Sequence, residues 1–326
     1  MESTQQRGDG ISIVVPVFNG ERSVPELVRQ LEPVLAENAA VPGAFEAILV
    51  NDGSRDGSWQ AICDLAGRFP WVHGIDLMRN YGQHNALMCG IRAASFRWIV
   101  TMDDDLQHPP DQLPIVLAKL KEGYDVVYGV PERLSHGPVR NLMSSGAKIL
   151  IAKATGNKNV RDISAFRGIR ADLRSSLSTY DSPTVVLDVL LGWTTSRFAS
   201  VTVRQEPRRI GSSNYGPFRL LNQLLLVYTS YTTFPLRMSS MIGFFFTMFG
   251  FVLLLYVLIR YMIQGSQPGF PFLASIITIF GGVQLFSLGV IGEYLGRMFE
   301  RTMNRPTFVI RTQTPGGNKP SDAADE

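Results

Sequence analysis

Three consecutive acidic residues end an apolar run in the stretch "TMDDDLQHPP", residues 101–110. The preceding "RWIV" has the composition of a buried strand, so Asp103, Asp104 and Asp105 fall at the edge of a core. Like charges there repel one another and resist desolvation unless a cation, a hydrogen-bond network or open water compensates them. A divalent metal ion is the sharpest explanation, because such ions prefer hard oxygen ligands.

The elements that must position these carboxylates follow from the first half of the chain. Short β-branched apolar runs alternate there with amphipathic helical segments, and the runs cover residues 11–17, 45–52, 72–78 and 97–103. This alternation predicts an α/β domain over residues 11–215, with a mostly parallel, doubly wound sheet and right-handed crossovers. In such a sheet, ligands bind beyond the carboxyl ends of the strands.

Polar side chains gather at three of these strand ends. The first strand is followed by "PVFNGE", the second by "NDGSRDGS" and the fourth by "DDDLQ". A carboxylate can accept an imide N–H or a ribose hydroxyl, and glycine allows close backbone approach, so these loops suit a nucleotide. Taken alone, "NDGS" is also a common turn, and Asp52 could cap a helix. The absence of GxGxxG and GxxxxGK[ST] after the first strand argues against a dinucleotide fold or a P-loop ATPase.

Composition excludes several other classes. The net charge of +3 over 326 residues is too small to indicate nucleic acid as a partner. Cys63 and Cys89 have no CxxC spacing, which argues against a zinc site or a disulfide framework and favours a reducing compartment. The polar N-terminal tail, residues 1–10, has no apolar segment typical of a secretory signal. We therefore expect the α/β domain in the cytoplasm.

Two long uncharged segments follow this domain, at residues 238–259 and 261–292. At about 1.5 Å per residue, the first is long enough to cross a hydrocarbon core of roughly 30 Å. We predict two transmembrane helices, 238–260 and 272–292, within residues 238–296. A pair of buried core helices is the weaker alternative, because such helices usually keep a polar face.

The charges flanking these helices predict their orientation. Arg219 and Arg237 precede the first helix, and four arginines follow the second: Arg297, Arg301, Arg305 and Arg311. By the positive-inside rule, both flanks face the cytoplasm, with Arg260 discordant. Residues 297–326 are then a cytoplasmic C-terminal segment and a disordered tail. Residues 216–237 are a juxtamembrane amphipathic helix at the interface or, equally, an ordinary packing helix.

Six motifs in order carry a resemblance over Ile11 to Arg311: "VVPVFNGE", "VNDGSRDGS", "RNYGQHNALMCGI", "DDDLQHPP", "EGYDVVYG" and "IGEYLGRMFERTMNRP". Together they resemble the membrane-bound family 2 glycosyltransferases that load a sugar onto a polyprenyl phosphate, especially the branch that transfers 4-deoxy-4-formamido-L-arabinose. The resemblance implies a Rossmann-like glycosyltransferase A fold in a bacterial inner membrane. It also implies inverting transfer from a nucleotide-diphosphate sugar, UDP-linked, to undecaprenyl or another polyprenyl phosphate, for a cell-envelope glycan or lipid.

The same resemblance assigns metal ligands in the acidic run. Asp103 and Asp105 match the ends of the family's DXD motif. Asp105 and Gln107 would bind Mg²⁺ or Mn²⁺, and Asp103 would contact the metal, a metal-bound water or the ribose. Asp104, the middle position, counts among the donor-binding residues, although strand alternation would turn it away from its neighbours. We expect the adjacent His108 to be a solvent-facing loop residue.

The acceptor phosphate is already anionic, so the reaction requires cations more than a strong base. After Pro138, the stretch "PVRNLMSSGAKILIAK" places Arg140, Ser144 and Lys148 on one helix face. By resemblance, the acceptor-binding residues are Arg133, Arg140 and Ser144, which with Asp103 and Asp105 complete the expected catalytic set. A solvated basic face is the alternative explanation.

The donor-binding set implied by the resemblance draws on all these loops. This chain departs from the family pattern at two positions. Gly20 stands where the family has a glutamate, with Glu21 one position later, and Asn214 stands where the family commonly has a lysine. The expected set is Pro16, Phe18, Asn19, Glu21, Asp52, Gly53, Arg79, Asp103, Asp104, Arg208 and Arg209.

Three other functions compete with this interpretation. A processive polysaccharide synthase would need more membrane helices and a QxxRW signature, which "LGWTTSRF" does not provide. A non-catalytic membrane scaffold with a nucleotide-binding domain predicts loss of the acidic run, which is intact. The same reaction could also take its sugar from a glucose donor or from GDP-mannose. Small residues in "GFFFTMFG" and "FGGVQLFSLG" are compatible with a homo-oligomer.

Overall fold

The computed structural model describes residues 8–131, 163–182, 185–206, 234–264, 269–303 and 305–316. The chain divides into two units. The α/β unit comprises residues 1–216 and 304–326, and the helical unit comprises residues 217–303. Each unit is described separately below.

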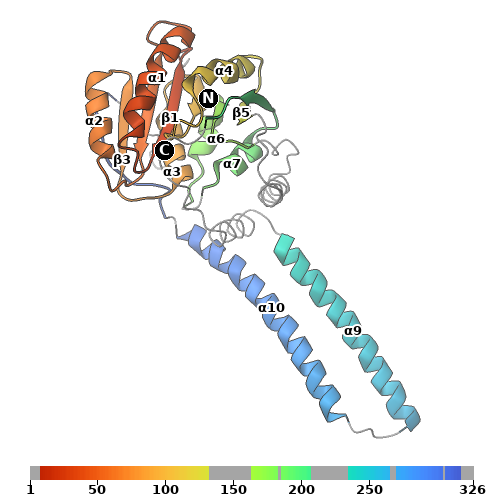
Figure 1. The fold of residues 1–326 in the computed structure, drawn as a ribbon. Coiled ribbons are helices and arrows are strands. Elements are labelled where there is room, and N and C mark those ends of the chain that lie inside the picture. Colours follow the sequence, from red (N-terminus) through yellow and green to blue (C-terminus); the bar gives the residue numbers. More distant parts are fainter. Residues whose placement is uncertain are drawn as a thin grey trace, which may run out of the picture. The chain divides into compact units, whose positions relative to one another are not determined.

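The α/β unit begins with alternating strands and helices (Figure 1). This first part contains β1 (Ile11–Val17), α1 (Ser23–Asn38), β2 (Phe45–Asn51), α2 (Ser58–Arg68), β3 (Val72–Leu77), α3 (Gln83–Ala93) and β4 (Trp98–Thr101). It continues with the 3-10 helix η1 (Pro110–Gln112), α4 (Leu113–Lys121), β5 (Val126–Pro131), β6 (Arg167–Arg170), η3 (Ala171–Leu173), α6 (Arg174–Ser178), α7 (Leu187–Thr194) and β7 (Phe198–Val203). A last strand, β8 (Ile310–Gln313), follows the helical unit in sequence.

These strands form one eight-stranded sheet in the order β7-β5-β6-β4-β1-β2-β3-β8. The pairs β1–β2, β1–β4, β2–β3 and β5–β7 are parallel, whereas β6 and β8 run antiparallel to their neighbours. The predicted mostly parallel, doubly wound sheet is therefore confirmed. Because β1 to β4 are mutually parallel, their carboxyl ends lie at one edge of the sheet.

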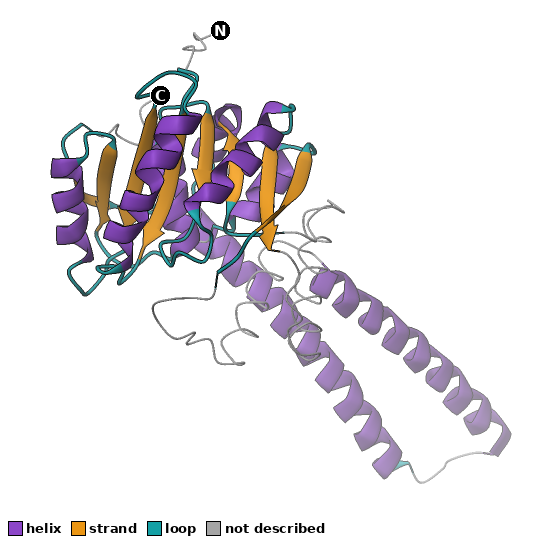
Figure 2. Ribbon diagram, turned by 45° about the horizontal axis from the view of Figure 1, so that its top comes forward, coloured by secondary structure: helices purple, strands orange, loops and turns teal. Residues whose placement is uncertain are grey.

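Helices cover both faces of this sheet (Figure 2). Helices α1, α2 and α4 contribute to one buried cluster, and α3, α6 and α7 contribute to the other. All seven residues of β1 are buried, since its side chains alternate between two covered faces. This is why the central strands read as continuous apolar runs rather than alternating ones.

The helical unit contains α9 (Phe234–Gln264) and α10 (Phe270–Thr302), which contact one another. Leu236–Arg260 and Ile279–Glu300 are long and apolar enough to cross a membrane. The expected pair of apolar helices is present, and each extends beyond the predicted span. The large exposed side chains of α9, such as Phe244 and Phe245, suit a lipid environment.

Several elements differ from the sequence-based predictions. Strand β4 ends at Thr101, so the acidic residues lie in a turn and not on a strand. Strand β8 falls inside the segment 297–326, assigned to a C-terminal segment and tail, and no local pattern predicted it. Its Ile310 pairs with Leu77 of β3, and Phe308 just before it is buried.

Candidate active site

Four loops meet the carboxyl edge of the sheet. We call them loop 1 (residues 18–22, after β1), loop 2 (52–57, after β2), loop 3 (78–82, after β3) and the acidic loop (102–109, after β4). All four follow mutually parallel strands, so they lie side by side at the edge where ligands bind in sheets of this kind.

Glutamine amides hold two carboxylates of the acidic loop. Gln83, the first residue of α3, donates from Nε2 to Asp103 Oδ1 at 2.6 Å. Gln107 donates from Nε2 to Asp105 Oδ2 at 2.6 Å and from its backbone N–H to Oδ1 at 3.1 Å. These neutral donors orient the carboxylates without cancelling their charge.

Asp104 instead contacts the start of α1, directly after loop 1. Its Oδ2 accepts a hydrogen bond of 3.1 Å from Ser23 Oγ at the start of α1. Burial, together with the charges of Asp103 and Asp105, raises the pKa of Asp104 to about 7, against the lowering effect of the Ser23 hydrogen bond. The expected strand alternation does not apply, because this segment is a turn. The donor-binding role expected for Asp104 stays a prediction.

The chain after β7 reaches the acidic loop. Gln205 Nε2 donates to Gln107 Oε1 at 3.0 Å, and the backbone N–H of Glu206 donates to the Gln107 carbonyl at 2.8 Å. Residues 207–233, which include the predicted Arg208 and Arg209 as well as Asn214, lie outside the described residues. The segment that leads into them is thus anchored next to the predicted metal ligands.

Loops 1 and 2 are joined by reciprocal hydrogen bonds. Asn19 donates from its backbone N–H to Ser54 Oγ and accepts from the Arg55 N–H at its Oδ1, both at 2.9 Å. Glu21 Oε2 accepts from the Gly57 N–H at 3.2 Å. The positive φ of Asn19, 55°, turns the chain toward loop 2. The side chains of Asn19 and Glu21, both expected to bind the donor, therefore have partners within the protein.

Asp52 holds loop 3. Its carboxylate accepts the backbone N–H groups of Tyr81 and Gly82, at 2.7 and 2.9 Å, ahead of α3. Burial raises the pKa of Asp52, and these two hydrogen bonds oppose the shift. A Cβ on Gly53 would lie 2.5 Å from the backbone of loop 3. The close approach at Gly53 is therefore made by the protein's own chain. The alternative that Asp52 caps a helix is wrong, because neither α2 nor α3 has a side-chain cap hydrogen bond.

Other predicted donor-binding residues differ in exposure. Pro16 is buried near the end of β1, whereas Phe18 is 49% exposed in loop 1. Arg79 is exposed in loop 3, where its guanidinium stacks on the Tyr81 ring at 4.6 Å. Phe18 and Arg79 thus offer an aromatic face and a cation at the carboxyl edge.

The expectation for His108 is wrong. Its side chain is buried, and its ring stacks on Phe166, which precedes β6, with centroids 5.4 Å apart. Burial lowers its pKa, so the ring is neutral at pH 7. The apolar "PP" that follows turns inward with it, since Pro109 and Pro110 are also buried.

The predicted acceptor site is not within the described part of the chain. Residues 132–162 contain Arg133, Arg140 and Ser144 together with Lys148, so their roles stay predictions. Sequence reasoning also missed three residues that hold the acidic loop, namely Ser23, Gln83 and Gln205. Of these, Gln83 had a signal, because it stands in the motif "RNYGQH" directly after the third apolar run.

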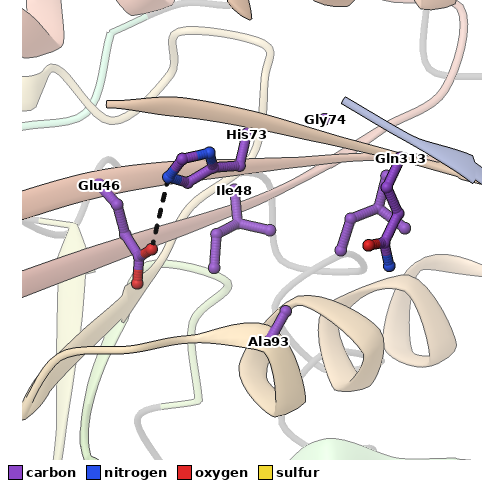
Figure 3. Close-up of a pocket in the computed structure, with 7 residues that line it drawn as sticks. Glu46, Ile48, His73, Gly74, Ala93 and Gln313 are labelled. Carbon is purple, nitrogen blue, oxygen red and sulfur yellow. Dashed lines mark ion pairs between the residues drawn. The ribbon is translucent and has the colours of Figure 1, made fainter. Parts of the chain in front are cut away.

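A second carboxylate site lies near the start of β2, at the opposite end of the strand from loop 2, and its lining residues are drawn in Figure 3. Glu46, near the start of β2, faces His73 of β3 across a small pocket that Ile48, Ala93 and Gln313 also line. Five residues, roughly 16 Å of strand, separate Glu46 from the carboxyl end of β2. This pocket is therefore distinct from the site at the four loops.

The acidic loop fits a metal ion that a substrate helps to coordinate. Among the described residues, no three His, Cys, Asp or Glu side chains are placed to bind one ion. The hard oxygen atoms here are those of the Asp103 and Asp105 carboxylates, which repel one another, and that of the Gln107 amide. Mg²⁺ is commonly held by one or two carboxylates plus substrate phosphates, so this donor set suits a complex completed by a diphosphate.

The fold is that of a glycosyltransferase, as the match to known proteins shows. Residues 12–176 match the description "Glycosyl transferase family 2", and the chain belongs to this family. It is 35% identical over 312 residues to undecaprenyl-phosphate 4-deoxy-4-formamido-L-arabinose transferase of Shewanella sediminis (strain HAW-EB3), covering 94% of this chain and 93% of the relative. The enzyme of the same name from Pseudomonas paraeruginosa (strain DSM 24068 / PA7) is 32% identical over 93% of this chain and 89% of the relative.

Solved structures support the fold. Glucosyl-3-phosphoglycerate synthase from Mycobacterium tuberculosis, in complex with Mn²⁺, UDP and glucosyl-3-phosphoglycerate, is similar with a TM-score of 0.50 and 18% identity. The similarity covers 69% of this chain and 79% of that structure. At this identity, the likeness concerns the fold.

Proposed function

We propose that this glycosyltransferase moves a sugar from a nucleoside diphosphate, most simply UDP, to undecaprenyl phosphate or a related polyprenyl phosphate. A phosphate oxygen of the lipid attacks the anomeric carbon, the bond from that carbon to the diphosphate breaks, and the configuration inverts. The products are a polyprenyl-monophosphate sugar and the nucleoside diphosphate, which keeps the bonding electrons.

One observation carries this proposal. The chain aligns over nine-tenths of its length, apolar helices included, with relatives named for transfer to undecaprenyl phosphate. A lipid acceptor also explains why a sheet that binds polar ligands is followed in sequence by two helices apolar enough for a membrane. The positive flanks of those helices support an inner-membrane protein whose α/β unit faces the cytoplasm.

The residues of the acidic loop have distinct roles in this proposal. Asp105, Gln107 and Asp103 would hold Mg²⁺ or Mn²⁺, which as a Lewis acid neutralises the diphosphate as it departs. Gln83 and Gln205 keep these ligands oriented. Phe18 and Arg79 are placed to meet the base and the diphosphate, while Arg133, Arg140 and Ser144 are proposed for the acceptor phosphate.

Transfer of radiolabel tests the proposal. Membranes containing the protein receive undecaprenyl phosphate and labelled UDP-4-deoxy-4-formamido-L-arabinose, UDP-glucose or GDP-mannose, with Mg²⁺, Mn²⁺ or a chelator. We expect metal-dependent labelling of the lipid from the first donor. Asp105→Asn should abolish it, and Asp64→Asn, which alters an exposed carboxylate of α2, should not.

The donor panel separates the remaining alternatives. Labelling from UDP-glucose or GDP-mannose instead would keep the chemistry and change the sugar. A folded wild-type protein that labels lipid from no donor, with or without metal, would contradict the proposal and favour a non-catalytic scaffold.

A further inference from the structure

Gly20 in loop 1 leaves a space that a side chain of the acidic loop occupies. A Cβ atom built on Gly20 would lie 2.0 Å from Asp104 Oδ2, much closer than any real contact, and 3.0 Å from Val17 Cγ1. Gly20 is buried, and its φ is not in the left-handed region, so backbone conformation is not the reason for a glycine here. The position of the Asp104 carboxyl group supplies the reason.

The site of this contact is otherwise tightly organised. The Gly20 N–H donates to Ser58 Oγ at 2.8 Å, and its carbonyl accepts the N–H groups of Ser23 and Val24, which open α1. Ser23 Oγ lies 3.1 Å from Asp104 Oδ2, so the carboxyl group also sits at the N-terminal end of this helix.

We propose that Asp104 is a positioning residue: its carboxyl group fills the space left by Gly20 of loop 1 and, through Ser23, fastens the acidic loop to the start of α1. Asp103 and Asp105, on either side, are thereby kept at Gln83 and Gln107. Gly20, where the chain departs from its family pattern, and Asp104, the middle acid of the DDD run, are thus the two sides of one contact. This inference rests on the proposed function, because metal binding by the acidic loop belongs to it.

The contact predicts a specific pattern of rescue. Gly20→Ala must push the Asp104 carboxyl group aside, and this costs little stability because the group is the end of a flexible side chain. It should nevertheless disturb the neighbouring ligands and weaken metal binding about tenfold, as changes around metal ligands commonly do. Asp104→Ala removes the obstacle, so Gly20→Ala should have little further effect in that background.

The experiment measures Mn²⁺ binding directly. Full-length protein in detergent, with UDP present, is titrated with Mn²⁺, and free Mn²⁺ is followed by electron paramagnetic resonance. Gly20→Ala, Asp104→Ala, the double variant and Asp104→Asn are compared, with thermal unfolding measured on each. Gly67→Ala is the matched control, because a Cβ there meets nothing within 4 Å.

We expect Gly20→Ala to weaken Mn²⁺ binding about tenfold and the double variant to bind within about twofold of Asp104→Ala alone. Asp104→Asn, which keeps the shape and the acceptor for Ser23, should bind nearly as wild type. Equal losses in Asp104→Asn and Asp104→Ala would make Asp104 a metal ligand and overturn the inference. So would additive losses in the double variant, or unaltered binding by Gly20→Ala.

These outcomes also separate the inference from the proposed function. A wild-type protein that binds no Mn²⁺ with UDP would contradict both. Normal binding by the wild type, combined with any of the contrary patterns above, would overturn the role of Asp104 alone. A fall in unfolding temperature that accounts for the weaker binding of Gly20→Ala would likewise reduce Asp104 to a structural residue.

Discussion

Two carboxylate sites lie at opposite ends of the same sheet, and their surroundings differ. Glu46 is buried and accepts three hydrogen bonds: from Ser12 Oγ at 2.6 Å, from the Ser95 N–H at 2.6 Å and from Ser95 Oγ at 2.9 Å. His73 Nε2 lies 3.8 Å away (Figure 3). The acidic loop gathers three carboxylates, Asp103 to Asp105, and the donors described for them are amides, a backbone N–H and a hydroxyl.

We interpret the difference as one between an acid that stabilises the fold and acids that are proposed to bind a ligand. A single buried carboxylate surrounded by donors is satisfied within the protein and stabilises the fold. The acidic loop instead places three carboxylates next to one another, and such a group of like charges favours a cation. Each prediction below tests one side of this contrast.

Asp105→Asn should have the largest effect. It removes the charge of a proposed metal ligand but keeps the side-chain shape, so we expect transfer to fall at least about a hundredfold. The unfolding temperature should stay the same or rise, because like-charge repulsion is relieved. Lipid-linked product and thermal unfolding are measured on the same preparation. Retention of activity would show that the acidic loop is not the metal site.

Glu46→Ala should produce the reverse result. The side chains and N–H that bond to Glu46 would lose their acceptor, which destabilises the fold by about 2–3 kcal/mol. Denaturant unfolding of the α/β unit measures this loss, with the exposed Glu37→Ala as its control. Metal and donor affinities of the folded fraction should match wild type. A stable Glu46→Ala protein with impaired Mn²⁺ binding would remove the distinction between the two sites.

Gln83→Ala should weaken metal binding more moderately. The loss of its 2.6 Å hydrogen bond frees Asp103 to rotate, and we expect about a tenfold rise in the Mn²⁺ concentration for half-maximal activity. Gln60→Ala on α2, whose amide bonds to the exposed Asp64, is the matched control. An unchanged Mn²⁺ requirement would mean that Asp103 does not depend on this amide.

Arg311→Ala should have the smallest effect. Arg311 is half exposed, and its guanidinium lies 3.2 Å from the buried Asp76 carboxylate and 2.8 Å from the Met78 carbonyl of loop 3. Its loss should cost about 1 kcal/mol in denaturant unfolding, against Arg68→Ala as control. A loss several times larger would show that β8 carries more of the stability than its exposure indicates.

The sequence predicted the features that depend on local pattern. Continuous apolar runs indicated the parallel strands covered on both faces, and the acidic run after β4 indicated the candidate site. Strand β8 escaped prediction because four residues, partly polar, pair with β3 more than 230 residues earlier in the chain.

The site details that sequence reasoning missed also depend on distant partners. His108 is buried because Phe166, 58 positions later, provides a stacking surface. Asn19 and Glu21 bond to loop 2, and Asp52 bonds to loop 3, through contacts that residue type alone does not reveal. Residue type predicted which loops meet, whereas the structure distinguishes side chains that hold the loops together from those left to face a ligand.

Calorimetric titration of UDP into the full-length protein tests the central claim most directly. If the acidic loop is the metal-dependent donor site, UDP should give a binding heat in the presence of Mn²⁺. This heat should disappear when a chelator is added and in Asp105→Asn, and it should persist in Glu46→Gln. UDP binding of equal strength without metal, or in Asp105→Asn with metal, would contradict the account.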